Sequence, residues 1–192
     1  MSKKVGLFFG SFNPIHMGHL IIGDYVAQYT DLDQVWFVIS PHNPFKEKKS
    51  LAKDRDRLHL VHLAIEHNAR LWASDVEFNL PQPSYTIDTL TYLGEKYPTY
   101  QFALIIGGDN VSGLPKWKNS DVLMNNYPFY VYARPGYDEG LIQNYKNFTL
   151  LNAPLLDISS TYIRERLIQG HSIKYLVHPA VEAYIDSIQM YR

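Results

Sequence analysis

Residues 5–19 read VGLFFGSFNPIHMGH and combine a short apolar run with a polar loop that begins at a glycine. The run from Val5 to Phe9 is continuously apolar and is closed by Gly10, which is typical of a strand buried on both faces. Apolar residues near helical spacing then predict a helix over residues 18–29. A buried strand, a glycine-led loop and a helix form the first unit of a parallel sheet.

The remainder of the chain repeats this alternation of apolar runs and helical segments. Residues 40–50 contain two prolines and several lysines, which predict a loop. The order of the segments indicates an α/β fold in which helices cover both faces of a parallel sheet. At about 150 residues per domain and without a linker, the chain is expected to form one domain over residues 1–192. We expect strands at residues 35–39, 71–78, 102–106, 129–133 and 148–151, and helices at 54–68, 86–97, 159–169 and 179–188.

Composition excludes several functional classes. Lys and Arg number 18 against 19 Asp and Glu, so the net charge of −1 lacks the basic excess of general nucleic-acid binders. The chain has no cysteine, which excludes disulfides, thiolate zinc sites and cysteine nucleophiles. No apolar run approaches the ~20 residues of a membrane span, and the N-terminal apolar run is too short for a signal peptide. We therefore expect a cytoplasmic protein with no nucleic-acid or membrane partner.

The loop after the first predicted strand carries groups suited to phosphate. Gly10 allows a tight turn, and Ser11 offers a hydroxyl and an amide. His16 and His19 are three residues apart, so one helical turn puts both imidazoles beside the amides of a helix N-terminus, which favour anions. Imidazole donors there can stabilise a phosphoryl transition state. Two alternatives remain open: a metal-binding pair, and a pair of capping or core histidines.

A second polar cluster lies near the C-terminus, at residues 157–166. Ser159, Ser160 and Thr161 are suitable N-cap residues for the helix that follows. Arg164 lies about one turn into that helix and can point to the end where the free amides of the helix lie. Together with the hydroxyls, these groups would form a second phosphate-binding cluster. The alternative is an ordinary capped helix with exposed arginines.

Both clusters resemble the signatures of the nucleotidyltransferase superfamily. The HMGH element at residues 16–19 and the ISSTYIR element at residues 158–164 stand 140 residues apart in the expected order. The resemblance implies a Rossmann-like three-layer fold with a central parallel sheet, and transfer of a nucleotidyl group from a nucleoside triphosphate. The common form of the first signature has Asp where this chain has Asn13, and a loop-capping role suits either residue.

The middle of the chain indicates which branch of the superfamily is resembled. Its elements are PSYT at residues 83–86, GGD at 107–109, PKW at 115–117 and RPG at 134–136, and together they are similar to the bacterial nicotinate mononucleotide adenylyltransferases. Taken singly, each element has an ordinary reading as a turn, a cap, a solvated charge or a packed tryptophan. The resemblance implies that ATP and nicotinate mononucleotide react to give deamido-NAD and pyrophosphate. Mg²⁺ is expected to arrive bound to ATP, with no metal held by the protein alone.

The same resemblance implies a role for each matching residue. His16, His19 and Arg164 are the expected catalytic residues. The pyridine-nucleotide residues include Lys118, expected to act through its backbone amide, and Trp117, expected as an exposed indole that stacks on the ring. The expected ATP-binding residues are Gly10, Ser11, Phe12, Lys46, Gly107, Asp109 and Ser160, and the expected nicotinate-nucleotide residues are Tyr85, Thr86, Trp117, Lys118 and Arg134.

One departure and three alternatives accompany this reading. The family usually has a histidine immediately before Lys46, where this chain has Phe45, with His42 displaced upstream. The acceptor could instead be nicotinamide mononucleotide or a phosphopantetheine, and a nucleotide-binding regulator without turnover is a further possibility. A homo-oligomer is also compatible with the sequence.

Overall fold

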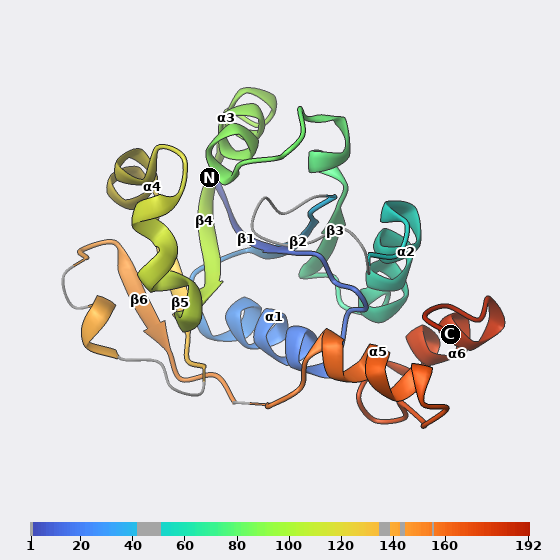
Figure 1. Cartoon of the computed structure of the whole chain (residues 1–192). Coiled ribbons are helices and arrows are strands. Elements are labelled where there is room, and N and C mark those ends of the chain that lie inside the picture. Colours follow the sequence, from blue (N-terminus) through green and yellow to red (C-terminus); the bar gives the residue numbers. More distant parts are fainter. Residues whose placement is uncertain (1, 42–50, 135–138, 143–144, 155) are drawn as a thin grey trace.

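The computed structural model describes residues 2–41, 51–134, 139–142, 145–154 and 156–192. Its centre is a parallel sheet of six strands in the order β3-β2-β1-β4-β5-β6 (Figure 1). The sheet confirms the α/β fold expected from the alternating pattern. The strands are β1 (Lys3–Gly10), β2 (Gln34–Ile39), β3 (Leu71–Ser74), β4 (Tyr100–Gly107), β5 (Phe129–Tyr132) and β6 (Phe148–Leu151).

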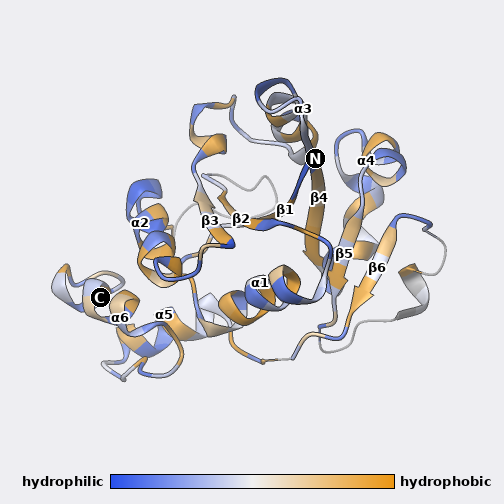
Figure 2. Ribbon diagram, turned by 180° about the vertical axis from the view of Figure 1, so that it is seen from behind, coloured by the Kyte–Doolittle hydropathy of each residue, from blue (hydrophilic) through white to orange (hydrophobic). Residues whose placement is uncertain are grey.

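Helices cover both faces of the sheet and complete three layers. The helices are α1 (Met17–Tyr29), α2 (Asp54–Ile65), α3 (Thr86–Lys96), α4 (Ser120–Asn126), α5 (Ser160–Ile168) and α6 (Pro179–Ser187), with 3-10 turns η2 (Val76–Asn79), η3 (Gly108–Lys116) and η4 (Glu139–Ile142). One core cluster joins the sheet to α1, α2, α5 and α6, and the other joins it to α3, α4 and η3. Leu7 and Phe8, adjacent in β1, enter different clusters because successive side chains of a strand point to opposite faces. Figure 2 shows β4 and β5 as largely hydrophobic strands between these layers.

Three expectations about the elements need correction. The strand expected over residues 71–78 ends at Ser74, because the chain then turns into η2, where the backbone N–H of Phe78 donates to the carbonyl of Asp75 at 2.8 Å. The helix expected over residues 54–68 ends at Ile65. Helix α4 was not expected, since its seven residues are too few to show a clear period.

The strand order places a crevice at the carboxyl ends of β1 and β4. From β1 the chain proceeds to β2 and β3 on one side and then returns to β4 on the other side of β1. Ligands of open α/β sheets bind at such a switch point. Gly10 and Gly107 end the two strands there. Within the described residues, no helix is long and apolar enough to cross a membrane.

Candidate active site

A cavity of about 630 Å³ opens at these strand ends. All of the site residues expected from the sequence line it, apart from Lys46, which lies outside the described residues together with His42 and Phe45. The structure thus brings together segments that are far apart in the chain. The expected residues along its wall are Gly10, Ser11, Phe12, His16, His19, Tyr85, Thr86, Gly107, Asp109, Trp117, Lys118, Arg134, Ser160 and Arg164.

The two histidines form a stacked pair at the start of α1. Their ring centroids are 3.7 Å apart and the ring planes are inclined by 24°. The backbone N–H of His16 donates to Nδ1 of His19 at 3.4 Å. Because Nδ1 of His19 accepts this hydrogen bond, a neutral His19 carries its proton on Nε2. Nδ1 of His16 is buried and has no hydrogen-bond partner among the described residues.

The pKa of His16 yields a prediction about stability. Burial first, and then the positive charge of Arg134, lower this pKa to about 4, against about 6.5 in an unfolded chain. Between these values the unfolded chain binds more protons, so stability falls as pH is lowered from about 6.5 to 4. We expect the free energy of unfolding of the wild type to fall by about 2.5 kcal/mol more between pH 7 and pH 4.5 than that of His16→Gln. Urea unfolding at both pH values measures the difference, and equal pH dependence in the two proteins would refute it.

The loop after β1 contains a strained residue. Phe12 has φ of 43°, in the left-handed region that bulky residues avoid, at a cost of about 1–3 kcal/mol. Its buried ring packs edge-on against His19 at 5.0 Å and Phe8 at 5.9 Å. A Cβ atom at Gly10 would lie 2.8 Å from this ring, so the position requires glycine. The ring of Phe12 thus supports the loop after β1 from within the core.

Several side chains hold the same loop from outside. Ser160 Oγ donates to the carbonyl of Pro14, and Arg164 Nη1 donates to the carbonyl of Asn13, both at 2.9 Å. The sequence suggested that Ser160 and Arg164 either bind phosphate or belong to an ordinary capped helix, and it did not predict that they hold this loop. Ser159 caps α5 as expected, accepting from the backbone N–H of Tyr162 at 3.1 Å.

Asn13 supports the loop through its side-chain oxygen. Oδ1 accepts from the backbone N–H of Ala52 at 3.1 Å and from the hydroxyl of Tyr191 at 2.8 Å. Both partners are donors, so a carboxylate oxygen could accept the same two bonds. The replacement of the usual Asp by Asn13 is therefore compatible with the loop geometry, as the sequence suggested.

Arg134 follows β5 and lies beside the histidine pair. Its Nε is 3.9 Å from Oδ1 of Asp109, and its Nη2 donates to the hydroxyl of Tyr132 at 3.5 Å. Nε is buried and makes no hydrogen bond within the described part of the chain. A Cβ at Gly107 would lie 2.4 Å from Oδ1 of Asp109, so a larger residue there would displace this carboxylate. Arg134, which was expected on the pyridine-nucleotide side, therefore has neighbours that were expected on the ATP side.

The other side of the cavity is built by α3 and η3. Tyr85 is the N-cap of α3 and Thr86 its first residue, so free first-turn amides lie at this side. Trp117 is half-buried and packs against the core cluster of α3 and η3, which corrects the expectation of an exposed indole. The Nζ of Lys118 pairs with Asp88 at 2.8 Å and lies 4.9 Å above the ring of Tyr85.

Sequence reasoning missed Glu77, a buried carboxylate in the cavity wall. It accepts hydrogen bonds from Ser84 Oγ at 2.9 Å and from Thr89 Oγ1 at 2.8 Å, which fix the start of α3. Burial raises the pKa of this carboxyl, against the hydrogen bonds from Ser40, Thr89 and Ser84. No signal in the sequence pointed to Glu77, because it lies within the strand expected over residues 71–78. Tyr132, beside Arg134, was missed as well.

The three-layer fold and its cavity at the switch point are those of a nucleotide-binding α/β protein. Residues 7–166 match the family model described as cytidylyltransferase-like, and the chain belongs to this family. Two relatives are named more particularly, each as a probable nicotinate-nucleotide adenylyltransferase. The relative from Cytophaga hutchinsonii is 53% identical over 98% of both chains, and that from Flavobacterium psychrophilum is 48% identical over 98% of this chain and 99% of its own.

The fold also matches solved structures. The nicotinic acid mononucleotide adenylyltransferase of Plasmodium falciparum, complexed with NaAD, superposes with a TM-score of 0.83 and 23% identity over 98% of this chain and 97% of its own. A structure described as a putative nicotinate-nucleotide adenylyltransferase from Vibrio parahaemolyticus gives a TM-score of 0.74 at 22% identity, over 99% and 96% of the two chains. At these identities the likeness concerns the fold.

Proposed function

We propose that this protein is a nicotinate-nucleotide adenylyltransferase that transfers AMP from ATP to nicotinate mononucleotide in NAD biosynthesis. The observation that carries the proposal is the convergence of the residues expected for ATP and for the pyridine nucleotide on one cavity at the carboxyl ends of β1 and β4. The relatives at 53% and 48% identity, named for this activity, support it over nearly the full chain.

The proposed reaction is a direct displacement at phosphorus. An oxygen of the mononucleotide phosphate attacks the α-phosphorus of ATP, the bond to the bridging oxygen breaks, and pyrophosphate leaves with the electron pair of that bond. The attacking phosphate is already ionised, so no general base is needed. Catalysis then consists of positioning and of stabilising the charge on the α-phosphate. His16, His19 and Arg164 are the residues proposed to do this.

The two substrates occupy different sides of the cavity in this proposal. ATP lies along Gly10, Ser11, Phe12, Ser160, Gly107 and Asp109, with Lys46 from the connection between β2 and α2. The pyridine ring lies against Trp117 near Tyr85, and its carboxylate meets the first-turn amides of α3, which favour negative charge. We propose that Lys118 contributes through its backbone, since its side chain is paired with Asp88. Arg134 is proposed to reach the mononucleotide from its place beside Asp109.

The metal-ligating side chains of the described residues bear on how a metal ion would be held. Among the described residues, no group of three or more His, Asp or Glu side chains could hold a metal ion. This arrangement fits a metal that is carried by the substrate, and we propose that Mg²⁺ enters with ATP, bound to phosphate oxygens. When bound, it neutralises charge on the triphosphate. The protein residues then orient the nucleotide.

Trp117→Ala tests the pyridine side. Loss of ring stacking is expected to raise KM for nicotinate mononucleotide about tenfold and to leave KM for ATP nearly unchanged. Trp117→Phe, which keeps an aromatic face, should recover most of the affinity. Trp72→Ala is the matched control, since Trp72 lies 56% exposed on β3, away from the cavity. A parallel rise in both KM values, or the same effect in the control, would argue against stacking.

The function itself is tested by pyrophosphate release from ATP. Nicotinate mononucleotide, nicotinamide mononucleotide and phosphopantetheine are compared as acceptors in parallel. We expect the highest kcat/KM with nicotinate mononucleotide. A preference for either other acceptor would move the protein to a neighbouring branch, and no release with any acceptor would leave a nucleotide-binding protein without turnover.

A further inference from the structure

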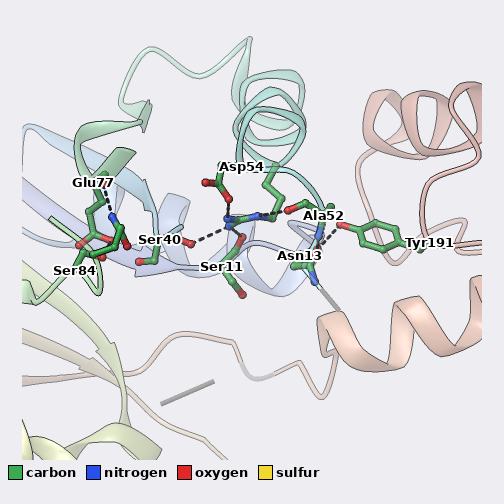
Figure 3. A network of polar contacts seen from close by, with 10 residues as sticks. Ser11, Asn13, Ser40, Ala52, Asp54, Glu77, Ser84 and Tyr191 are labelled. Atoms are coloured by element: carbon green, nitrogen blue, oxygen red, sulfur yellow. Dashed lines mark hydrogen bonds and ion pairs between the residues drawn. The ribbon is translucent and has the colours of Figure 1, made fainter. Parts of the chain in front are cut away.

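Arg57 of α2 is the most deeply buried charged residue of the described chain, with a side chain that is 0% exposed. Its guanidinium is surrounded by acceptors from other segments, drawn in Figure 3 with Ser11, Ser40, Ala52 and Asp54 labelled. Nη2 pairs with Asp54 at 2.7 Å, Nε donates to the carbonyl of Ala52 at 3.1 Å, and Nη1 donates to the carbonyls of Ser40 at 3.1 Å and of Ser11. Arg57 is absent from the described lining of the cavity.

The carbonyls bound by Arg57 belong to the segments that surround the proposed phosphate subsite. Ser11 lies in the loop after β1, Ser40 follows β2, and Ala52 precedes α2. These segments are also tied to one another, because the backbone N–H of Ser40 donates to the carbonyl of Gly10 at 2.9 Å. One guanidinium thus fixes the loop after β1 relative to both ends of the connection between β2 and α2.

The strained backbone of Phe12 explains why the hydrogen bonds of Arg57 matter for the loop after β1. Phe12, with φ of 43°, lies between Ser11 and Asn13. The carbonyl of Ser11 is held by Arg57, while the carbonyl of Asn13 is held by Arg164 and its side chain by Ala52 and Tyr191. A strained conformation persists only where its surroundings determine it from both sides. Without Arg57, the carbonyl of Ser11 loses this hydrogen bond, and the bond from the Ser40 N–H to the carbonyl of Gly10 remains one residue earlier.

We propose that Arg57 is a positioning residue for the phosphate half of the cavity. It acts through the backbone of Ser11, and so sets the loop that leads to His16 and His19 at the start of α1, without touching a substrate. The inference rests on the proposed function for the identity of the substrates. A lysine cannot replace it fully, because a compact ammonium cannot match the planar fork that reaches acceptors on several sides.

The test compares Arg57→Met, Arg57→Lys and Arg70→Met. Arg70 is the matched control, because it also donates to two backbone carbonyls, those of Leu32 and Asp33, at the opposite end of β2. Steady-state kinetics with ATP and nicotinate mononucleotide are measured at a temperature where circular dichroism shows each variant to be folded. Binding of a non-hydrolysable ATP analogue, measured by calorimetry, provides a readout that does not require turnover.

We expect Arg57→Met to lower kcat/KM for ATP about 100-fold, as a small displacement of catalytic groups does, with KM for the mononucleotide within about twofold of the wild type. For Arg57→Lys, we expect a kcat/KM for ATP between that of Arg57→Met and that of the wild type. Arg70→Met should be less stable than the wild type, but its kcat/KM for ATP should not fall selectively. The analogue should bind more weakly to both Arg57 variants. If Arg57→Met does not fold, the kinetics of Arg57→Lys and its binding of the ATP analogue test the proposal.

Two outcomes would overturn the inference. One is a folded Arg57 variant whose kinetics and analogue binding equal those of the wild type. The other is a loss of kcat/KM that is equal for both substrates and equal in the Arg57 and Arg70 variants. A wild type that releases no pyrophosphate refutes the proposed function instead. In that case, the analogue binding of the Arg57 variants still decides whether Arg57 positions the loop.

Discussion

Replacing His19 with alanine will lower kcat about a thousandfold and change KM for ATP by less than about threefold. The reason is that His19 lies beside His16 in the cavity and its Nδ1 accepts the backbone N–H of His16, which leaves the proton of a neutral ring on Nε2. A donor that is fixed before the reaction stabilises charge as it develops on the α-phosphate. It contributes less to binding of the ground state.

Two further variants separate the donor from the loop contact. Asparagine at position 19 can keep an acceptor near the place of Nδ1 but lacks Nε2, whereas glutamine can place an amide donor near Nε2. We therefore expect His19→Gln to retain more activity than His19→Asn. His62→Ala, on the exposed side of α2, is the control and should behave as the wild type. A His19→Ala enzyme with normal kcat would remove His19 from the chemistry.

Replacing Arg164 with methionine will lower kcat/KM for ATP about a thousandfold, the scale on which an arginine stabilises a phosphoryl transition state. Arg164 has five N–H donors, and the structure engages two of its nitrogens, through Asn13 at 2.9 Å and Thr161 at 3.3 Å. The remaining donors can meet a phosphate in the cavity that Arg164 lines. The same residue thus holds the loop and, in the proposed function, offers charge to the ligand.

The control variant for this prediction is Arg166→Met. Arg166 lies on the same helix two residues later, but it donates to the carbonyl of Ser172 at 2.9 Å on the exposed surface. It should leave the kinetics intact. Arg164→Lys should restore part of the activity, because it keeps the charge without the fork. Equal kinetics in the Arg164 and Arg166 variants would assign Arg164 to loop support alone.

Much of the fold follows from short-range patterns. Each apolar run and each helical period is contained within one short segment of the chain, and these patterns predicted the parallel strands that the structure contains. The failure at residues 71–78 has a physical cause. The pairing of β3 with β2 ends at Ser74 and Val38, although β2 continues to Ile39, and pairing between segments far apart in the chain is not visible in the sequence of β3.

Some residues of the site could be predicted from their spacing in the sequence, and others could not. His16 and His19, or Ser159 and Arg164, lie within one or two helical turns, so their spacing alone placed them on common sides. Glu77 and Arg57 could not be found like this. The partners of Arg57 lie 46 and 17 positions away, and Tyr191 reaches Asn13 across 178 positions. The half-buried state of Trp117 depends on α3 and η3 packing beside it.

The sequence by itself determined the α/β alternation, the glycine-led loop and the kinds of side chain that face a phosphate, because spacing along a strand or helix fixes these locally. Only the tertiary structure decided that His16 is neutral when buried beside Arg134, and that Arg57 joins three backbone segments. Burial and long-range hydrogen bonds depend on which distant segments pack together. The near-zero net charge accordingly conceals two cations, Arg134 and Arg164, that lie with the histidine pair along one cavity at the edge of the sheet.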